Sequence, residues 1–518
     1  MKTPISSRVP LSRRHGERGV TIVLVALAMV AIIAMAALSI DVITLYLAKQ
    51  EAQRSADAAA LAAAKVISLS GLTGDPRNVT SNWALICGPD DGTNGVATRT
   101  AKAVVNQNLV ANGSAATPTV TYSSGGTSSS DCTALSSTGF GVNPIVTVQL
   151  NRTNLPTFFS RIWGPRSNSI SATATAEVFN PSNSGNSGSQ PTGTIIPVQP
   201  RCVKPWVVPN QDPWTTAPNR HGYFCGQHDP IDRVDMPSCN PLVSTTDGSI
   251  QHPGISVNGG GLSGVIGETF WLSPDCRWTA TGNCTLREST PQANFNNGSG
   301  FMKGADPGNP PNYPNLVFAP GQVGVTPVIG VPSCTNGNEF EEAIEGCDQP
   351  TNYTCGVSPD NGGTNAIDLS RYPDTPTSNG VACLIHQSDV GNWTSASGQD
   401  FLSPFAQPST YPFQMSAGSS NPLLTAGLSS GTPVSVSPSI VSLPIYDEKD
   451  PGVNLQSGRM SQVTFVGFLQ VFINSVDQFG NVNVTVLNVS GCSNGQSSLV
   501  GTPVVANSPV PIRLITPP

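Results

Sequence analysis

The sequence predicts an α+β protein: a long N-terminal transmembrane helix that continues into a small extracytoplasmic α+β domain, followed by a large disulfide-rich irregular β domain. Three observations support this fold class. Residues 20–40 are apolar and uncharged, and about 20 such residues form a helix that spans a bilayer core. All twelve cysteines follow this run. Charged residues make up 11% of the chain, against about 25% in an ordinary soluble domain.

Length and charge limit the other possibilities. The chain has 518 residues, and a prior of about 150 residues per domain predicts several units. The formal net charge is −7 and the sequence pI is about 5.2, so no basic surface for nucleic acid is expected. The 51 glycines and 46 prolines favour a turn-rich β protein over a cytosolic enzyme.

The residues before the apolar run set its orientation. Five of them are basic and one is acidic: Lys2, Arg8, Arg13, Arg14, Arg18 and Glu17. The positive-inside rule therefore places residues 1–19 in the cytoplasm and makes residues 20–41 the transmembrane helix. A cleaved secretory signal is the alternative, but the run is longer than a signal core and its Ala34-Met35-Ala36 site lies inside it. We therefore expect a retained anchor.

The helix is predicted to continue beyond the membrane. Residues 41–67 contain neither Gly nor Pro, and good helix formers dominate them. As one helix, residues 20–67 would measure about 72 Å. Small apolar residues recur every three or four positions along the second half: Leu45, Ala48, Ala52, Ala56, Ala59, Ala63 and Val66. This stripe either packs on the protein's own domain or packs against helices of other subunits, and both can hold.

Residues 42–179 are predicted to form the small α+β domain. After the long helix, periodicity and turn residues predict a series of elements. They are a loop over 72–94, a helix over 96–111, a strand over 117–122, a Ser/Gly-rich loop over 123–137, a strand over 145–150, a short helix over 154–163 and a strand over 169–179. The two loops contain Cys87 and Cys132, which could pair with each other.

The rest of the chain has a different composition. Residues 180–199 read as a flexible linker, since residues 180–193 contain no large apolar residue. Residues 200–518 read as the Cys-rich β domain, nearly without helical periodicity. Its strongest signal is a hairpin of residues 463–476 and 481–489 around a turn at 477–480.

The cysteines are candidates for disulfides, because disulfides persist outside the cytoplasm. Buried free thiols are the alternative, and the connectivity stays open. The candidates are Cys87, Cys132, Cys202, Cys225, Cys239, Cys276, Cys284, Cys334, Cys347, Cys355, Cys383 and Cys492.

Three patterns suggest chemistry, but none is specific. His221, Cys225, His228 and Cys239 have zinc-ligand types, and Asp229, Asp232 and Asp235 have calcium-ligand types, yet disulfides and turns explain them equally well. Residues 491–495 fit a nucleophile-elbow string, but no helix is predicted after them. Phosphate and dinucleotide motifs are absent. We therefore expect no catalytic, cofactor or metal site, and a protein that is not an enzyme.

Two segments carry a family resemblance. Arg18-Gly19 precedes the apolar run, which ends in Leu38-Ser39-Ile40-Asp41-Val42, and the block from Gln53 to Ala64 reads QRSADAAALAAA. These residues resemble the TadE/TadG-like proteins of the tight-adherence (Flp-type) pilus system. Residues 155–159 and 170–176 resemble the end of the pilin-like region in that group.

The resemblance implies a non-enzymatic, single-pass component of a Tad/Flp pilus in the bacterial inner membrane, with its bulk in the periplasm or at the cell surface. Its partners would be the membrane and other Tad or pilin-like subunits. Residues 42–179 would be the pilin-like domain. The residues expected to serve anchoring and helix packing are Val20, Ile40, Asp41, Leu45, Ala52, Ala56, Asp57, Ala59 and Ala63.

The sequence departs from the family in two respects. The metal motif of the von Willebrand A-type domain, which some members carry, is absent. Leu24 stands where processed prepilins have Glu, so cleavage after Gly19 is not implied.

Two other classes of function stay open. A membrane-tethered hydrolase would use a catalytic pair from among the acidic residues and His221, His228, His252 and His386. An envelope adhesin or carbohydrate-binding protein would use Trp206, Trp214, Trp271, Trp278 or Trp393 as stacking platforms.

Overall fold

The computed structural model describes the chain in segments. They are residues 17–70, 80–113, 118–124, 126–135, 140, 144–155, 168–178, 198–200, 203–214, 228–229, 234–235, 240–245, 250–251, 264–274, 315–322, 328–329, 339–348, 368–369, 374–388, 397–402, 415–434, 436–447, 463–491, 504–506 and 510–515.

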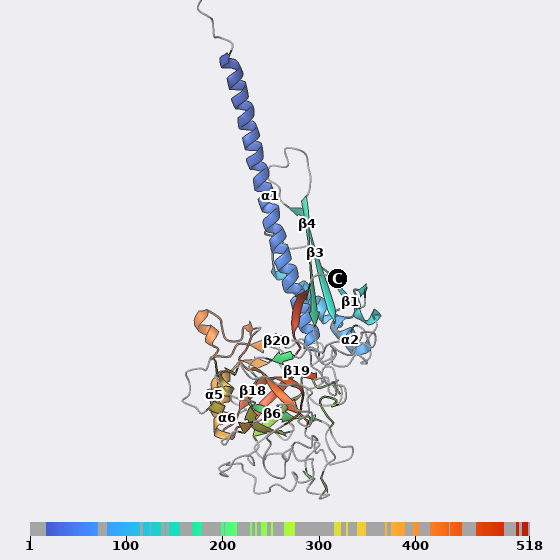
Figure 1. Ribbon diagram of the computed structural model, residues 1–518, viewed down its shortest axis with the longest axis vertical. Helices are drawn as coiled ribbons and strands as arrows, with labels where there is room; N and C mark the ends of the chain where they lie inside the picture. Colours follow the sequence, from blue (N-terminus) through green and yellow to red (C-terminus); the bar gives the residue numbers. More distant parts are fainter. Residues whose placement is uncertain are drawn as a thin grey trace, which may run out of the picture.

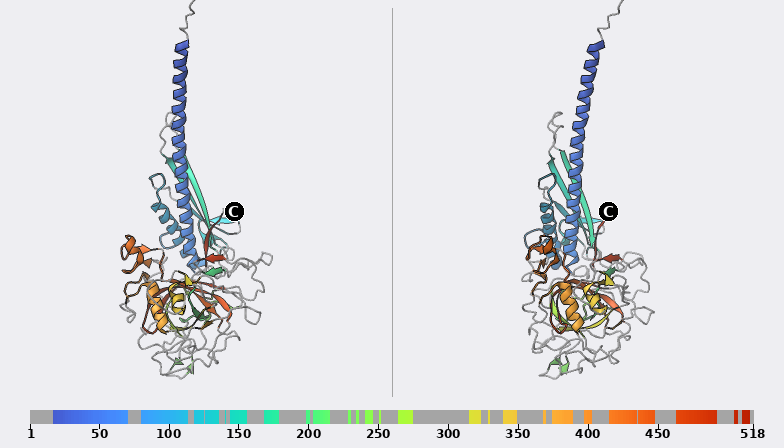
Figure 2. Two further views of the ribbon diagram at one scale, coloured as in Figure 1. Left: turned by 60° about the vertical axis from the view of Figure 1, so that its left-hand side comes forward. Right: turned by 90° about the vertical axis from the view of Figure 1, so that its left-hand side faces the viewer.

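The first element is a single uninterrupted helix, α1 (Glu17–Ser68), of 52 residues. This confirms the helix predicted over 20–67. One half of α1 stands clear of the molecule, and the other half lies along a β-sheet (Figures 1 and 2). The helix ends with its last carbonyls satisfied, since the Ser68 and Ser70 hydroxyls donate to the carbonyls of Lys65 and Ile67.

The sheet against α1 is antiparallel and five-stranded, in the order β2-β1-β3-β4-β21. Alternation in β3 and β4 places Val146, Val148, Leu150, Ala172, Ala174 and Ala176 on the buried face, as the sequence predicted for strands 145–150 and 169–179, and Thr175 is buried between two of them. The bounds are β1 (Thr119–Ser124), β2 (Thr127–Ser129), β3 (Ile145–Leu155), β4 (Asn168–Val178) and β21 (Ile512–Ile515).

Two shorter helices complete this core. α2 (Thr80–Cys87) occupies part of the segment expected to be a loop, because Trp83, Ile86 and Cys87 are buried on one side of it. α3 (Val96–Gln107) confirms the helix predicted over 96–111, although it ends four residues early in a turn. A disulfide joins Cys87 to Cys132 in the 3-10 turn η2 (Cys132–Ala134), as proposed from the sequence.

Two other expectations for this region were wrong in part. The predicted loop over 123–137 contains β2, which forms a hairpin with β1. Residues 154 and 155 end β3 instead of starting a helix, because the β3–β4 ladder extends to Leu155 opposite Asn168. The rest of that predicted helix lies outside the described residues.

The second large sheet has the strand order β13-β10-β6-β17-β18-β19-β9. Because β10 also pairs with β9, the six strands from β10 to β9 close into a ring, which leaves no open edge between them. The predicted hairpin is confirmed as β18 and β19. The bounds are β6 (Trp206–Pro209), β9 (Thr269–Pro274), β10 (Asn315–Gln322), β13 (Asp368–Leu369), β17 (Ile440–Tyr446), β18 (Phe465–Val476) and β19 (Val482–Gly491).

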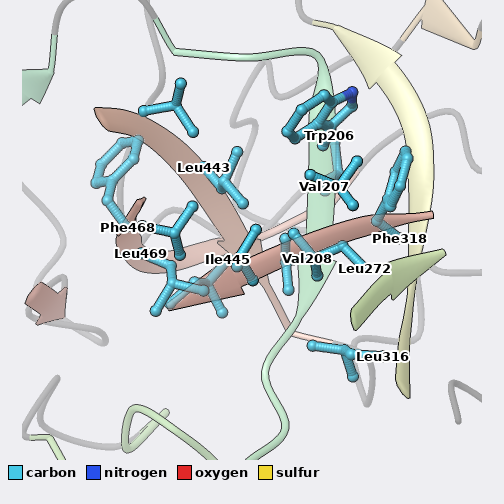
Figure 3. Close-up of a cluster of buried hydrophobic side chains, with 14 of the residues drawn as sticks. Trp206, Val207, Val208, Leu272, Leu316, Phe318, Leu443, Ile445, Phe468 and Leu469 are labelled. Atoms are coloured by element: carbon cyan, nitrogen blue, oxygen red, sulfur yellow. The ribbon is translucent and has the colours of Figure 1, made fainter. Parts of the chain in front are cut away.

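The ring encloses a hydrophobic core. Side chains from different strands point toward one another inside it, among them Trp206, Phe318 and Ile445 (Figure 3). The rings of Trp206 and Phe318 have centroids 5.5 Å apart, a distance at which aromatic pairs attract. The interior is therefore packed like a protein core and is not a channel.

The remaining elements are short. Two α-helices, α5 (Glu339–Glu345) and α6 (Asp374–Ile385), lie in a region where almost no helix was expected, because their apolar periodicity extends over a few turns only. The small sheets are β7 (His228–Asp229) with β8 (Val234–Asp235), β11 (Val328–Ile329) with β12 (Cys347–Asp348), β5 (Val198–Pro200) with β20 (Val504–Ala506), and β14 (Phe401–Leu402), β15 (Met415–Ser416) and β16 (Pro433–Val434). The 3-10 helix η9 (Pro422–Ala426) lies between β15 and β16.

The chain returns to its first sheet near its end. β21 pairs with β4 in register, Ile512 opposite Val178 and Ile515 opposite Thr175. Val510 is buried in the core around α1. The division into residues 42–179 and 200–518 stays a prediction, and the last strand of the second part completes the sheet of the first.

Candidate membrane anchor and helix-packing face

The free half of α1 exposes a continuous apolar surface. Its large side chains, from Val20 to Leu47, are between 46% and 71% exposed. In water, so large an apolar surface would be strongly unfavourable. Among the described residues, α1 is the helix that is long and apolar enough to cross a membrane. Val20 and Ile40, two of the predicted anchor residues, lie on this surface.

Asp41 marks the boundary between the two halves. It is the first buried residue along α1, with 4% of its surface exposed, and it follows twenty-one positions with almost continuous exposure. Its backbone carbonyl accepts a hydrogen bond from the Thr44 hydroxyl at 2.8 Å. The charge that ends the apolar run in the sequence therefore stands where the helix first meets the rest of the protein.

The alanine stripe of the second half is buried. Ala52 is 2% exposed, and Ala56, Ala59 and Ala63 have no exposed surface. They pack in one cluster with buried side chains of α3, β3 and β4, and Leu45 packs against its edge. Because alanine adds only a methyl group, the sheet and α3 can approach the α1 backbone closely. The stripe is thus filled by the protein's own domain.

Polar side chains of α1 cover the backbone edge of β4. Lys49 donates to the carbonyl of Ser171 and Gln53 donates to the carbonyl of Thr173, the latter at 3.0 Å. The Gln53 amide also donates to Asp57 Oδ1 at 2.8 Å, which orients it toward the strand. β21 then pairs with the next part of β4, Thr175 to Val178. The edge of this strand is therefore closed, which prevents uncontrolled strand addition.

This gives Asp57 a role that the sequence reasoning did not assign. Lys49, Gln53 and Asp57 are spaced by four residues, so they share one face of the helix. That spacing was visible in the sequence. The strand that the face meets was not, because β4 lies more than a hundred residues further along the chain.

A different face of α1 remains open. Gln50, Arg54 and Ala58 are exposed along the second half of the helix. On its flank, Glu51 Oε2 accepts a hydrogen bond at 2.8 Å from the backbone N–H of Ala111, in the turn after α3. Gln50, Arg54 and Ala58 together form the open face of α1.

The other candidate residues are mostly in structural positions or outside the described segments. Trp206 and Trp271 are fully buried, and Trp214 is half-buried with its Nε1 donating to the Thr269 carbonyl. These three cannot serve as open stacking platforms in this conformation. His386 ends α6 in the left-handed region, at φ 58°. Trp278, Trp393, His221 and His252 lie outside the described residues.

Among the described residues, the side chains with metal-ligand chemistry do not come together in one cluster. In the described part of the chain, no three His, Cys, Asp or Glu residues lie close enough to hold a metal ion. His228 and Asp235 face each other in the β7–β8 ladder. Cys225, Cys239 and Asp232 are not described. Besides Cys87 and Cys132, Cys383 is disulfide-bonded, and the described segments contain no free cysteine.

A buried lysine escaped the sequence reasoning. Lys204, just before β6, is 3% exposed, and its Nζ donates to the Gly346 carbonyl at 2.6 Å. Desolvation lowers the pKa of Lys204 to about 7, although the charge of the nearby Glu345 acts in the opposite direction. Burial also raises the pKa of Glu341, on the same helix as Glu345. The hydrogen bond from Lys204 to Gly346 therefore joins the start of β6 to the end of α5.

The comparison with family models concerns α1. Residues 19–66 match the Tad family, described as "Putative Flp pilus-assembly TadE/G-like". This confirms the resemblance to TadE/TadG-like proteins, which rested on residues within the same segment. All matched residues lie within α1, in both its exposed and its buried half. No curated protein and no solved structure matches the chain.

Proposed function

We propose that this protein is a non-enzymatic, single-pass inner-membrane component of a Tad/Flp pilus assembly or adherence apparatus. The observation that carries the proposal is that the family match and α1 cover the same segment of the chain. The family match covers residues 19–66, and the structure divides this segment at Asp41 into an exposed apolar half and a half that supports a folded domain. The first half is the anchor, and the second presents the domain on the periplasmic side.

The shape of the domain supports a pilin-like reading of residues 42–179. A helix that leaves the membrane and continues without a break along an antiparallel sheet makes anchor and domain one rigid unit (Figure 1). Such a unit can pack beside other membrane helices without a flexible stalk. The Cys-rich part beyond residue 200 would then contact partners or the pilus base.

Contact with other subunits is proposed for the open face of α1. The alanine stripe is already filled by the sheet and α3, so it offers no surface to a neighbour. Gln50, Arg54 and Ala58 are exposed and lie directly below the apolar run. A partner that approaches α1 beyond the headgroup layer, on the periplasmic side, would reach these residues.

The experiment is a co-purification from native membranes. Tagged full-length protein and an Arg54→Glu/Ala58→Glu variant are isolated, and Tad components are identified by mass spectrometry. We expect the variant to remain in the membrane and to lose most of the co-purifying pilus subunits, about tenfold for a loss of roughly 1.4 kcal/mol. Thr127→Glu, on the exposed strand β2, is the matched control and should change nothing.

Unchanged recovery of pilus subunits with the Arg54→Glu/Ala58→Glu variant would count against this face. Absence of any Tad component with the unmodified protein would count against the function. The non-enzymatic assignment rests on the family and would be overturned by labelling of the purified protein with an activity-based hydrolase probe.

A further inference from the structure

The apolar surface of α1 extends past Asp41 on one side. Ile43 and Leu47 are 56% and 52% exposed, and Tyr46 beside them is also exposed, although the domain has already begun. Ile43, Leu47 and Glu51 are spaced by four residues and therefore share one helix face. This face faces neither the sheet nor the alanine cluster.

The turn after α3 lies beside this face and carries another exposed apolar side chain. The hydrogen bond from Ala111 to Glu51 holds residues 108–113 against α1, one helical turn below Leu47. Leu109, in this turn, is 54% exposed, whereas its neighbour Val110 is completely buried. Figure 2 shows the end of α3 directed toward the free half of α1.

The outward position of Leu109 is fixed by the local backbone. Val110 and Gly113 exchange two backbone hydrogen bonds, at 3.0 and 3.2 Å, which close a tight turn. Ala111 and Asn112 within it both adopt positive φ, 49° and 58°, a conformation that L-residues disfavour. A turn held this tightly presents Leu109 in a defined direction.

The dimensions of α1 place these side chains at the membrane surface. The exposed apolar surface from Val20 to Leu47 measures about 42 Å at 1.5 Å per residue. A bilayer is about 30 Å thick in its hydrocarbon core and about 40–45 Å with the headgroup layers. Side chains on a helix tilt toward its N-terminus, here toward the membrane. Leu47 therefore reaches the outer part of the headgroup layer, and the turn that carries Leu109 lies about one helical turn beyond it.

We propose that Ile43, Tyr46, Leu47 and Leu109 form an apolar foot that inserts into the headgroup layer of the periplasmic leaflet. This inference rests on the proposed membrane insertion of α1. Lipid is the occupant because the foot continues the apolar surface of the anchor without a break. Tyr46 suits this depth, since its ring is apolar and its hydroxyl is polar. The foot is a second contact, from α3, that stops the domain from swinging about its anchor.

Site-directed spin labelling tests the foot. Full-length Leu109→Cys protein is labelled and placed in vesicles of phosphatidylethanolamine and phosphatidylglycerol. Collision rates with oxygen, which prefers lipid, and with a water-soluble nickel chelate are then compared. Ser128→Cys, on the exposed strand β2, is the matched control. We expect the oxygen-to-nickel ratio at position 109 to exceed that at position 128 several-fold.

Two results would overturn the foot. One is equal ratios at both positions while the protein resists extraction by alkaline carbonate, which would leave the anchor intact. The other is dipolar broadening at position 109 that disappears on dilution into excess lipid, since a second copy would then occupy the surface. Loss of carbonate resistance in the unmodified protein would instead contradict the anchor itself.

A Leu109→Asp variant gives an independent measurement. Leu109 is exposed, so the substitution should leave the fold intact, and circular dichroism checks this. A nitroxide at Ser128 should become more mobile in the variant, because the domain loses one of its two contacts with the bilayer. Unchanged mobility at position 128 would contradict the restraining role.

Discussion

Arg513 and Glu177 lie 336 positions apart in the chain and form an ion pair, with Arg513 Nη2 2.7 Å from a Glu177 carboxylate oxygen. The pair sits on the β21–β4 ladder and marks the point where the end of the described chain rejoins the anchored sheet. Arg513 is largely exposed, so the ion pair itself contributes little to the free energy of unfolding. The buried side chains beside the ion pair contribute more to stability.

Val510 should therefore hold β21 in place more strongly than Arg513. Val510→Ala removes buried methyl groups from the core around α1 and should lower the free energy of unfolding by about 2 kcal/mol. Arg513→Ala should have almost no effect. Limited proteolysis of full-length protein in detergent would show faster cleavage near residue 510 in the first variant only. Equal protection of both variants would contradict the ranking.

The alanine stripe allows a test with a nearly identical control. Ala56 has no exposed surface and Ala58, two residues further, is exposed on the open face. Ala56→Leu should force α1 away from the sheet and cost about 1–3 kcal/mol. Ala58→Leu should be neutral in denaturant unfolding of the full-length protein. Similar stability of the two variants would mean that the sheet does not pack on Ala56 this closely.

The Cys87–Cys132 disulfide should stabilise the N-terminal core. It closes a loop of 45 residues and ties α2 to η2. Replacing both cysteines with serine should lower stability by about 2–5 kcal/mol. Thermal unfolding with and without a reductant is the measurement. The unmodified protein should lose stability on reduction, whereas the doubly substituted protein should respond less.

Lys204 should make stability depend on pH. Its pKa is about 7 in the folded protein against 10.5 in the unfolded chain, so the unfolded chain binds more protons between these values. The free energy of unfolding should then rise with pH above about 7, by up to about 2 kcal/mol at pH 9. This gain in the free energy of unfolding is lost as the pH falls back toward 7.

Urea unfolding of full-length protein and of Lys204→Met provides the measurement, and the variant should show a flatter pH profile. Burial lowers the pKa of Lys65 as well, so part of the slope should persist. The scan stays below about pH 9, because burial raises the pKa of Tyr122 and would reverse the slope at higher pH. An unchanged slope in Lys204→Met would contradict the assignment.

The sequence predicted those elements whose cause is local. α1 followed from apolar composition and the absence of Gly and Pro from residue 20 onward, and β3 and β4 followed from alternation. α2 was missed because it is only eight residues long, between turn residues. The pairing of β9 with β10 and of β21 with β4 leaves no local trace, since each depends on residues far apart in the chain.

The candidate site was predictable to a similar degree. The apolar half, the Asp41 boundary and the buried stripe could all be predicted from spacing and composition. The surface that fills the stripe could not, because alanines suit a neighbouring subunit as well as a neighbouring sheet. Leu109 carried no signal either, since a single leucine after a helix is exposed or buried according to the turn that follows.

The late position of β21 in the chain has a consequence for folding. Among the described residues, 510–515 are the last to be synthesised, yet the outer edge of β4 is complete only when they arrive. Until then the nascent domain presents unpaired backbone groups between Thr175 and Val178. A chaperone that shields exposed strand edges would bind this protein at that edge, and its release would coincide with the pairing of β21 with β4.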